Sequence, residues 1–281
     1  MRPDVTELME FYARPLGGMV RRILAHRIRA RWRRVPGATV IGLGFATPYL
    51  GSFRAEAGRL GAFMPTTQGA MVWPASGLVH TVVVDEDRLP LPDNSVDHLL
   101  AVHCVEASEN IGGLLREMWR VLKPEGRVLM IVPNRRGVWA RLDTTPFGHG
   151  RPYSPSQLER LLADALFTPI DWSAALYMPP FDHRLILRSA MTMERLGARM
   201  SPAFAGVSIV EAKKELMAPI GRGATARALP QLVPSRSVRS AVLDPFTSPN
   251  CASAEIQPSR RACCAPSAAC GSRCRAAGPR H

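Results

Sequence analysis

The sequence lacks three features that would point to a membrane or a secreted protein. It has no run of about 18 apolar residues, so it predicts no membrane-spanning helix. The layout of a signal peptide is missing as well, because Asp4, Glu7 and Glu10 interrupt the first residues. Only Cys104 precedes residue 250, which argues against a disulfide framework and favours a reducing cytoplasm. Cys104 stands in an apolar run, and we expect it to be a small core residue.

Lysine is also scarce. The chain has three lysines (Lys123, Lys213 and Lys214), so arginine supplies most of a formal net charge of +13. We interpret this excess as a solvated basic surface. Contact with nucleic acid or with an anionic membrane surface stays open as the alternative.

Residues 226–281 differ in composition from the rest. They contain eight arginines, two acidic residues and a single aromatic residue, Phe246, while proline, serine, alanine and cysteine accumulate. Such a segment buries too little apolar surface to offset the entropy of ordering, so we expect a disordered tail. Its cysteines lack the paired spacing of a metal site, and no metal is predicted.

The most regular pattern lies between residues 81 and 133. Thr81–Val84 is a β-branched run that ends at an acidic turn, and Val96–Val102 is a second apolar run. Residues 109–122 have helical periodicity, and residues 127–132 form a third strand-like run. Strands that alternate with a helix predict a mainly parallel sheet. Ligands of such sheets bind beyond the carboxyl ends of the strands.

This stretch resembles class I S-adenosylmethionine-dependent methyltransferases, in particular a type 11-like group that includes quinone-biosynthesis enzymes. In that group an acidic residue precedes a Leu-Pro-Phe-Pro-Asp-like turn, and a helix ends in Arg-Val-Leu-Lys-Pro-Gly-Gly. The counterparts here are residues 85–93 and 120–126. The resemblance implies an α/β Rossmann-like sheet of about seven strands with helices on both faces. It also implies S-adenosylmethionine as cofactor and methyl transfer to a small-molecule acceptor.

Three segments follow from these patterns: a basic helical segment over 1–35, a methyltransferase-like domain over 36–225, and the tail over 226–281. Residues 5–34 predict one or two helices with a break near Pro15. We interpret this segment as packed across the sheet edge with its arginines in water. Docking on a membrane or on RNA is the alternative.

The remaining elements are predicted from local patterns. Ser154 opens a capping box, with proline at the first helical position. Strands are expected at 38–43, 62–64, 168–176 and 207–216, helices at 49–59, 154–166 and 184–200, and a helical turn at 67–72.

The resemblance implies a cofactor site with a degraded first motif. The family's Asp-x-Gly-x-Gly-x-Gly pattern corresponds to residues 42–48, where Gly44 keeps the first glycine. Gly42 replaces the aspartate, and alanine and proline replace the later glycines. The glycines of this motif let the backbone approach the cofactor closely. Thr47 lies in the same turn and is included in the candidate site.

The second and third motifs differ in how well they match. Met64 stands where the family has an acid for the ribose hydroxyls, and a thioether is a poor acceptor. Asp85 matches the family's acid beside the adenine amino group, with Glu86 and Asp87 next to it. A solvated acidic loop is the alternative. His103 ends the next strand, at a position that often lines the methyl-transfer mouth, although a structural role is as plausible.

The loop after the 127–132 strand is the candidate acceptor region. Two arginines, a tryptophan, a histidine and a tyrosine could bind a planar anionic acceptor, namely Arg135, Arg136, Trp139, His149 and Tyr153. The alternative is a surface loop in water.

In the implied reaction the protein aligns nucleophile, methyl and sulfur. A base such as His103 or His149 helps only if the acceptor must lose a proton, and no obligatory catalytic residue is predicted. Two other functions stay open: a binding or scaffold protein that has lost turnover, and an RNA-binding protein.

Overall fold

The computed structural model describes residues 3–199 and 201–215. The predictions for residues 226–281 lie outside the described residues. Within the described ranges, seven strands form one sheet in the order β3-β2-β1-β4-β5-β7-β6. The strands are β1 (Thr39–Gly44), β2 (Arg59–Pro65), β3 (Thr81–Val84), β4 (Val96–Val102), β5 (Leu122–Pro133), β6 (Phe167–Ala175) and β7 (Val207–Lys214).

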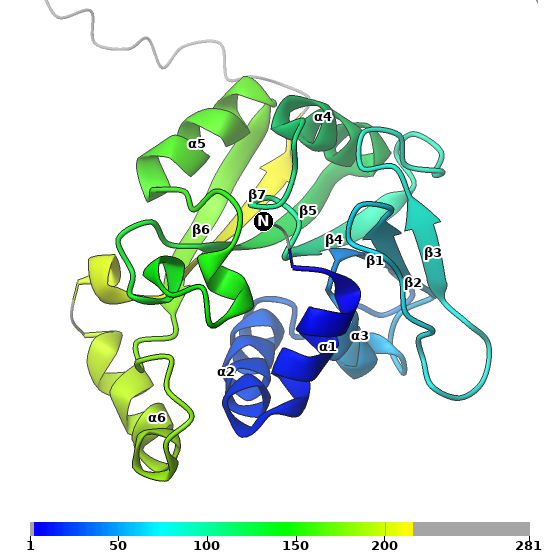
Figure 1. Cartoon of the computed structure of the whole chain (residues 1–281). Helices are drawn as coiled ribbons and strands as arrows, with labels where there is room; N and C mark the ends of the chain where they lie inside the picture. Colours follow the sequence, from blue (N-terminus) through cyan, green and yellow to red (C-terminus); the bar gives the residue numbers. More distant parts are fainter. Residues whose placement is uncertain (1–2, 200, 216–281) are drawn as a thin grey trace, which may run out of the picture. The chain divides into compact units, whose positions relative to one another are not determined.

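Helices separate most of these strands along the chain (Figure 1). They are α1 (Val5–Ala13), α2 (Pro15–Arg31), α3 (Thr47–Leu50), α4 (Ile111–Val121), α5 (Pro155–Asp164) and α6 (Arg184–Gly197), with short 3-10 turns at Gly51–Phe53, Trp139–Arg141, Pro146–Gly148 and Pro202–Phe204. None of the described helices has the length and apolar content needed to cross a membrane.

The sheet is parallel from β3 through β5, and β7 is antiparallel to both β5 and β6. This confirms the predicted Rossmann-like architecture of seven mainly parallel strands. The strand order reverses between β1 and β4, which are neighbours in the sheet although β2 and β3 intervene in sequence. Such a reversal opens a crevice at the carboxyl ends of the strands, where ligands of α/β proteins bind.

Two hydrophobic clusters cover the two faces of the sheet. Val40 of β1 packs with α1, α2 and α3, whereas Ile41 and Leu43 pack with α4 and α5. Alternation along a strand explains this division, because successive side chains point to opposite faces. Figure 1 shows the same arrangement, with α4 and α5 on one side of the sheet and α1, α2 and α3 on the other.

Helix α2 belongs to the first cluster rather than to the sheet edge. Its buried residues include Val20, Leu24 and Ile28. Trp32, which follows the helix, donates its indole N–H to Glu211 of β7 at 3.1 Å, and its ring lies 4.8 Å from that of His98 in β4. The basic segment is therefore anchored on a face of the sheet. The predicted break near Pro15 is confirmed, because α1 ends at Ala13 and α2 begins at Pro15.

Some predicted boundaries are wrong. The helix expected at 49–59 is short, because α3 ends at Leu50 and gives way to a 3-10 turn before β2 starts at Arg59. The helical turn expected at 67–72 is a plain turn at 66–68. Strand β5 begins at Leu122, directly after α4, because Leu122 pairs with Val96 across an irregularity in the register. The capping box at Ser154 is confirmed.

Candidate cofactor site

Asp85 and Thr66 lie side by side at the edge of the crevice. Asp85 follows the last residue of β3, and Thr66 follows the last residue of β2, the neighbouring strand. The hydroxyl of Thr66 donates to Oδ1 of Asp85 at 3.3 Å, and both residues are exposed. A carboxylate and a hydroxyl at this place can accept hydrogen bonds from a nucleoside. Sequence reasoning missed Thr66 because it ended the strand at Met64, one residue before the end of β2.

Glu86 and Asp87 have different surroundings from Asp85. Oε1 of Glu86 accepts hydrogen bonds from the hydroxyl of Ser108 at 2.8 Å and from the backbone N–H of Glu109 at 3.2 Å. Glu86 therefore ties the turn after β3 to the segment that precedes α4. Asp87 is exposed, and its Cβ faces Gly113 at the start of α4. The three acids predicted as one group therefore differ: Asp85 and Asp87 are exposed, whereas Glu86 joins the turn to the segment before α4.

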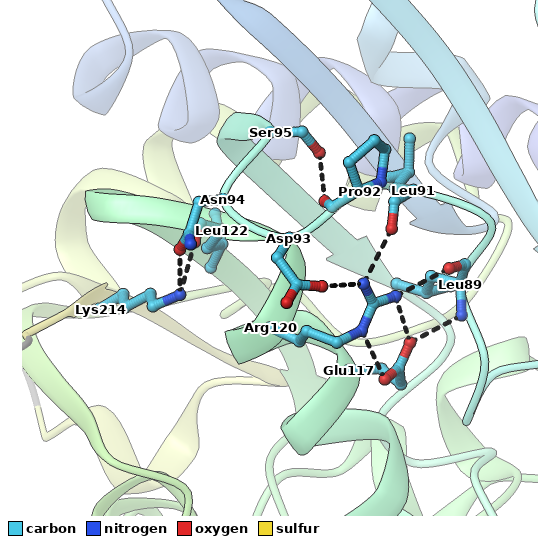
Figure 2. A network of polar contacts seen from close by, with 10 residues as sticks. All are labelled: Leu89, Leu91, Pro92, Asp93, Asn94, Ser95, Glu117, Arg120, Leu122 and Lys214. Atoms are coloured by element: carbon cyan, nitrogen blue, oxygen red, sulfur yellow. Dashed lines mark hydrogen bonds and ion pairs between the residues drawn. The ribbon is translucent and has the colours of Figure 1, made fainter.

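Arg120 of α4 holds the turn behind these acids (Figure 2). Its guanidinium donates to the backbone oxygens of Leu89 and Leu91 at 2.9 and 2.8 Å, and to Asp93 at 2.6 Å. It also donates twice to Glu117, at 2.9 and 2.8 Å. Glu117 in turn accepts the N–H of Leu89 at 2.9 Å. These contacts lower the pKa of Glu117, chiefly through the hydrogen bond from Arg120. The Arg-Val-Leu-Lys-Pro motif therefore begins with a residue that fixes the Leu-Pro-Leu-Pro-Asp turn.

Gly44 and Gly42 are glycines because of packing inside the protein. Gly44 has a φ of +76°, and a Cβ there would collide with the backbone oxygen of Val102 and lie 2.6 Å from Cβ of Cys104. At Gly42, inside β1, a Cβ would lie 2.6 Å from Cβ of Ala46 and 2.7 Å from Leu50. Gly44 therefore lets the end of β4 approach β1, and Gly42 lets α3 pack against β1. Neither needs a ligand to explain it.

Thr47 and Met64 are buried beside the loop that follows β2. Met64 is 0% exposed, and its sulfur accepts the N–H of Met71 at 3.4 Å. The hydroxyl of Thr47 points to the sulfur of Met71 at 3.6 Å. Thioethers thus occupy the place where the family resemblance expects a ribose-binding acid.

Cys104 is buried and free, as predicted for a core residue, and burial raises the pKa of its thiol. The neighbouring His103 is 1% exposed and has a φ of +53°. Its backbone oxygen accepts a hydrogen bond from the side-chain amide of Gln68 at 2.9 Å. Gln68 follows β2 and His103 follows β4, and β1 lies between these two strands. The hydrogen bond therefore crosses the carboxyl end of β1, where the resemblance places part of the cofactor.

Helix α1 covers the same end of the sheet. The hydroxyl of Tyr12 lies 3.0 Å from Nε2 of His103 and 3.0 Å from the hydroxyl of Tyr49. The Tyr12 ring is stacked on Phe45 with ring centres 5.5 Å apart. The N–H of Val5 donates to the backbone oxygen of Gln68 at 2.8 Å. Burial raises the pKa of Tyr12 and of Tyr49 well above the usual range. Sequence reasoning gave these α1 residues no role at the site.

The candidate acceptor loop is partly core. Trp139 is 1% exposed and donates its indole N–H to the backbone oxygen of Met178 at 2.8 Å, so the hypothesis that it binds an acceptor is replaced by a structural role. Arg135 and Arg136 are exposed. His149 lines a cavity of about 270 Å³ between α1 and residues 143–149, together with Glu7, Glu10 and Arg14 among others.

The residues present fit one half of S-adenosylmethionine better than the other. The exposed pair of Asp85 and Thr66 suits the nucleoside end. The end of β1 is covered by Gln68 and Tyr12. Five cavities of the described residues lie elsewhere, and none of these five is lined by Gly44, Asp85 or His103. Yet orphaned polar atoms lie under this cover, since Oε1 of Gln68 and both carboxylate oxygens of Glu106 lack hydrogen-bond partners. Most buried polar atoms have a hydrogen-bond partner, so each of these oxygens calls for an explanation, and a bound ligand is one such explanation. No group of His, Cys, Asp and Glu residues in the described ranges is placed to hold a metal.

Comparisons with known proteins agree with this fold. Residues 29–130 match the family model described as a methyltransferase domain. Two curated relatives, the ubiquinone/menaquinone biosynthesis C-methyltransferases UbiE of two Vibrio cholerae strains, are 40% identical over 55 residues. That match covers 20% of this chain and about a fifth (21%) of each relative's length.

Solved structures extend the likeness across the sheet. A chain from the complex of the Haloferax volcanii Trm112 methyltransferase activator with a methyltransferase is 19% identical, with a TM-score of 0.53 over 72% of this chain and 94% of that one. A Thermotoga maritima S-adenosylmethionine-dependent methyltransferase is 14% identical, with a TM-score of 0.52 over 75% and 96%. At these identities the likeness shows the fold. Together with the family match, it confirms the resemblance to class I methyltransferases of the type 11-like group.

Proposed function

We propose that the protein is an enzyme that transfers a methyl group from S-adenosylmethionine to a small-molecule acceptor. The observation that carries the proposal is the methyltransferase-domain match over 29–130, together with an exposed carboxylate, Asp85, at the carboxyl end of β3. This cofactor supplies an electrophilic methyl group on a sulfonium that is already a good leaving group. The protein then has to bind, orient and exclude water.

In this proposal the carboxylate of Asp85 accepts a hydrogen bond from the adenine amino group. The hydroxyl of Thr66 takes the place of the missing acid beside the ribose. Gly44 keeps the chain close to β4 at the end of β1, while Thr47 lies in the turn that follows. Glu86 and Asp87 add negative charge near a cationic cofactor, and Glu86 also holds the turn in place. Gly42 acts through packing of α3 against β1.

The cover over β1 sets a condition on this function. Binding of the whole cofactor requires the side chain of Gln68 to leave the backbone oxygen of His103. Because the backbone oxygen of Gln68 accepts a hydrogen bond from the N–H of Val5 in α1, we expect α1 to shift at the same time. Arg14 is the one residue between α1 and α2. In this proposal its extended backbone serves as the hinge about which α1 moves.

Calorimetric titration of the full chain with S-adenosylhomocysteine tests the proposal. We expect binding, and we expect Asp85→Asn to weaken it about tenfold, because one charge-assisted hydrogen bond contributes about 1.5 kcal/mol. Asp164→Asn is the matched control, since Asp164 is an exposed aspartate at the end of α5, just before β6 begins and so away from the carboxyl ends of the strands.

Two results would contradict the proposal. Absence of binding at millimolar ligand would reject the enzyme and favour a binding or scaffold role. Equal loss of affinity in both variants would remove Asp85 from the site.

A further inference from the structure

Tyr12 is held in a slot that is built for a phenol. Its ring is stacked on Phe45 and meets Tyr49 and His103 edge-on, with ring centres 6.2 and 5.9 Å away. The ring of Phe147 closes the far side of His103 at 4.6 Å. The walls of this slot come from the loops after β1 and β4, from α3 and from a 3-10 turn, whereas Tyr12 itself comes from α1. The slot therefore belongs to the sheet, and α1 fills it.

The hydroxyl of Tyr12 meets a base. Nε2 of His103 lies 3.0 Å from it, and both side chains are buried. On the other side of the ring, Nδ1 of His103 lies 3.3 Å from Oε1 of Glu106. The angles at that contact do not make a hydrogen bond, and both oxygens of Glu106 are buried without a donor. The two groups are close enough to attract but are not engaged in this conformation.

A buried carboxylate without a donor is costly unless a positive charge forms beside it. Glu106 is 4% exposed. The charge that this site can create is an imidazolium at His103, after Nε2 takes a proton from a hydroxyl in the slot. A small rotation of the ring or of the carboxylate would then engage Nδ1–H with Glu106. This is the arrangement of a general base with a group that orients it.

We propose that the slot over His103 is the acceptor subsite and that Tyr12 occupies it as an internal mimic of the acceptor. The acceptor class is a planar ring that carries a hydroxyl group. This proposal rests on the proposed function and deepens it. In the step assigned to the protein, the acceptor O–H bond breaks, its proton goes to Nε2 of His103, and the electron pair stays on the oxygen. That oxygen would then take the methyl group from S-adenosylmethionine, whose methyl carbon–sulfur bond would break and leave S-adenosylhomocysteine. His103 is the catalytic residue, and Glu106 is a positioning residue.

The closed state follows from the same geometry. While Tyr12 is in the slot, neither an acceptor nor the whole cofactor has room, because Gln68 is tied to both α1 and His103. Withdrawal of α1 at Arg14 opens both places together. The cofactor and a hydroxylated ring are therefore expected to displace α1 jointly.

Hydrogen exchange of α1 in the full wild-type chain tests this coupling. The probe is 4-methylphenol, which is the tyrosine side chain itself, and the matched control is toluene, which lacks the hydroxyl. In the chain without S-adenosylhomocysteine, whose binding displaces α1 by itself, we expect 4-methylphenol to speed exchange of the amides of residues 8–13 at least tenfold, and toluene to have little effect. Tyr12→Phe should lower the required 4-methylphenol concentration about tenfold, while Tyr177→Phe, at a tyrosine outside the slot, should not change it.

Two further measurements address His103 and Glu106. In the complex with S-adenosylhomocysteine and 4-methylphenol, the 15N shifts of the His103 ring should show a proton on Nδ1 and none on Nε2, and Glu106→Leu should abolish that preference. With S-adenosylmethionine and 4-methylphenol, mass spectrometry should detect the methyl ether, and Glu106→Leu should lower its yield at least tenfold while S-adenosylhomocysteine affinity stays within about twofold.

The outcomes separate the two proposals. If S-adenosylhomocysteine binds neither the wild type nor Tyr12→Phe, the proposed function fails, and the acceptor subsite fails with it. If it binds, but 4-methylphenol leaves α1 unchanged, the acceptor subsite alone is overturned. If toluene acts as well as 4-methylphenol, the hydroxyl has no partner at His103, and the assignment of a base is overturned.

Discussion

Two regions at the carboxyl ends of the strands differ in how their polar groups are satisfied. In the turn after β3, Arg120 and Glu117 hold the backbone of Leu89 and Leu91 through a closed set of hydrogen bonds. At the end of β1, Gln68 and Glu106 keep buried oxygens without partners. The first region also matches the family pattern closely, while the second departs from it. The comparison shows that Arg120, which begins the well-matched motif, supports the structure of the turn, whereas the buried oxygens without partners lie where the motif is degraded.

The largest expected effect sharpens the difference at the end of β1. Gly44→Ala places a Cβ against the backbone of Val102 at a φ of +76°. We expect a loss of about 3 kcal/mol in the free energy of unfolding, measured by urea denaturation. Gly51→Ala is the control, because a Cβ at Gly51 meets nothing within 4 Å, and its effect should stay within about 0.5 kcal/mol. A small effect at Gly44 would mean that this glycine is kept for a ligand alone.

A smaller effect should appear in the turn held by Arg120. Arg120→Met removes the donors to two backbone oxygens and leaves Glu117 without its cation. We expect a loss of about 2 kcal/mol by the same measurement, because charged hydrogen-bonding groups are left unpaired. Arg116→Met, at an exposed arginine on the same helix, should cost less than about 0.5 kcal/mol. Equal effects would show that the network contributes only as a surface ion pair.

The smallest effect is a dependence on pH. The hydrogen bond from Arg120 lowers the pKa of Glu117 below its ordinary value. A carboxyl group with a lowered pKa stabilises the fold fully above its unfolded pKa, and that contribution is lost as the pH falls through the folded value. The free energy of unfolding should therefore fall in acid. In Glu117→Gln, this decrease below pH ~4.5 should be smaller by up to about 1 kcal/mol. A variant with the wild-type slope would place the acid sensitivity elsewhere.

The sequence predicted the sheet because its signals are local. Thr81–Val84 and Val96–Val102 are found at the predicted residues, since each is a β-branched or apolar run between clear turn residues. The helix predicted at 49–59 failed because its length depends on the distance the chain must cover before β2, and no local residue encodes that distance. The position of Asp85 at the strand end was predicted for the same reason as β3, because the β-branched run Thr81–Val84 stops directly before it.

The cover over β1 was out of reach of sequence reasoning. Tyr12 and His103 are 91 residues apart, and nothing in the pattern of α1 shows which of its apolar residues will meet a histidine. Gln68 lies in a turn without periodicity. One signal was available: Glu106 is an acid between Val105 and Ala107, close after an apolar strand, and a buried acid needs a partner. Long-range pairing decides the site, whereas short-range pattern decides the fold.

The single residue between α1 and α2 has a practical consequence. Arg14 has an extended backbone, at which our proposal has α1 swing away, while the hydrogen bond from Trp32 to Glu211 holds the end of α2. An affinity tag or fusion partner attached ahead of Val5 would pull directly on the element that closes the slot. Ligand affinities measured on such a fusion would include the effect of the fusion on α1. An affinity tag should therefore be attached at the other end of the chain.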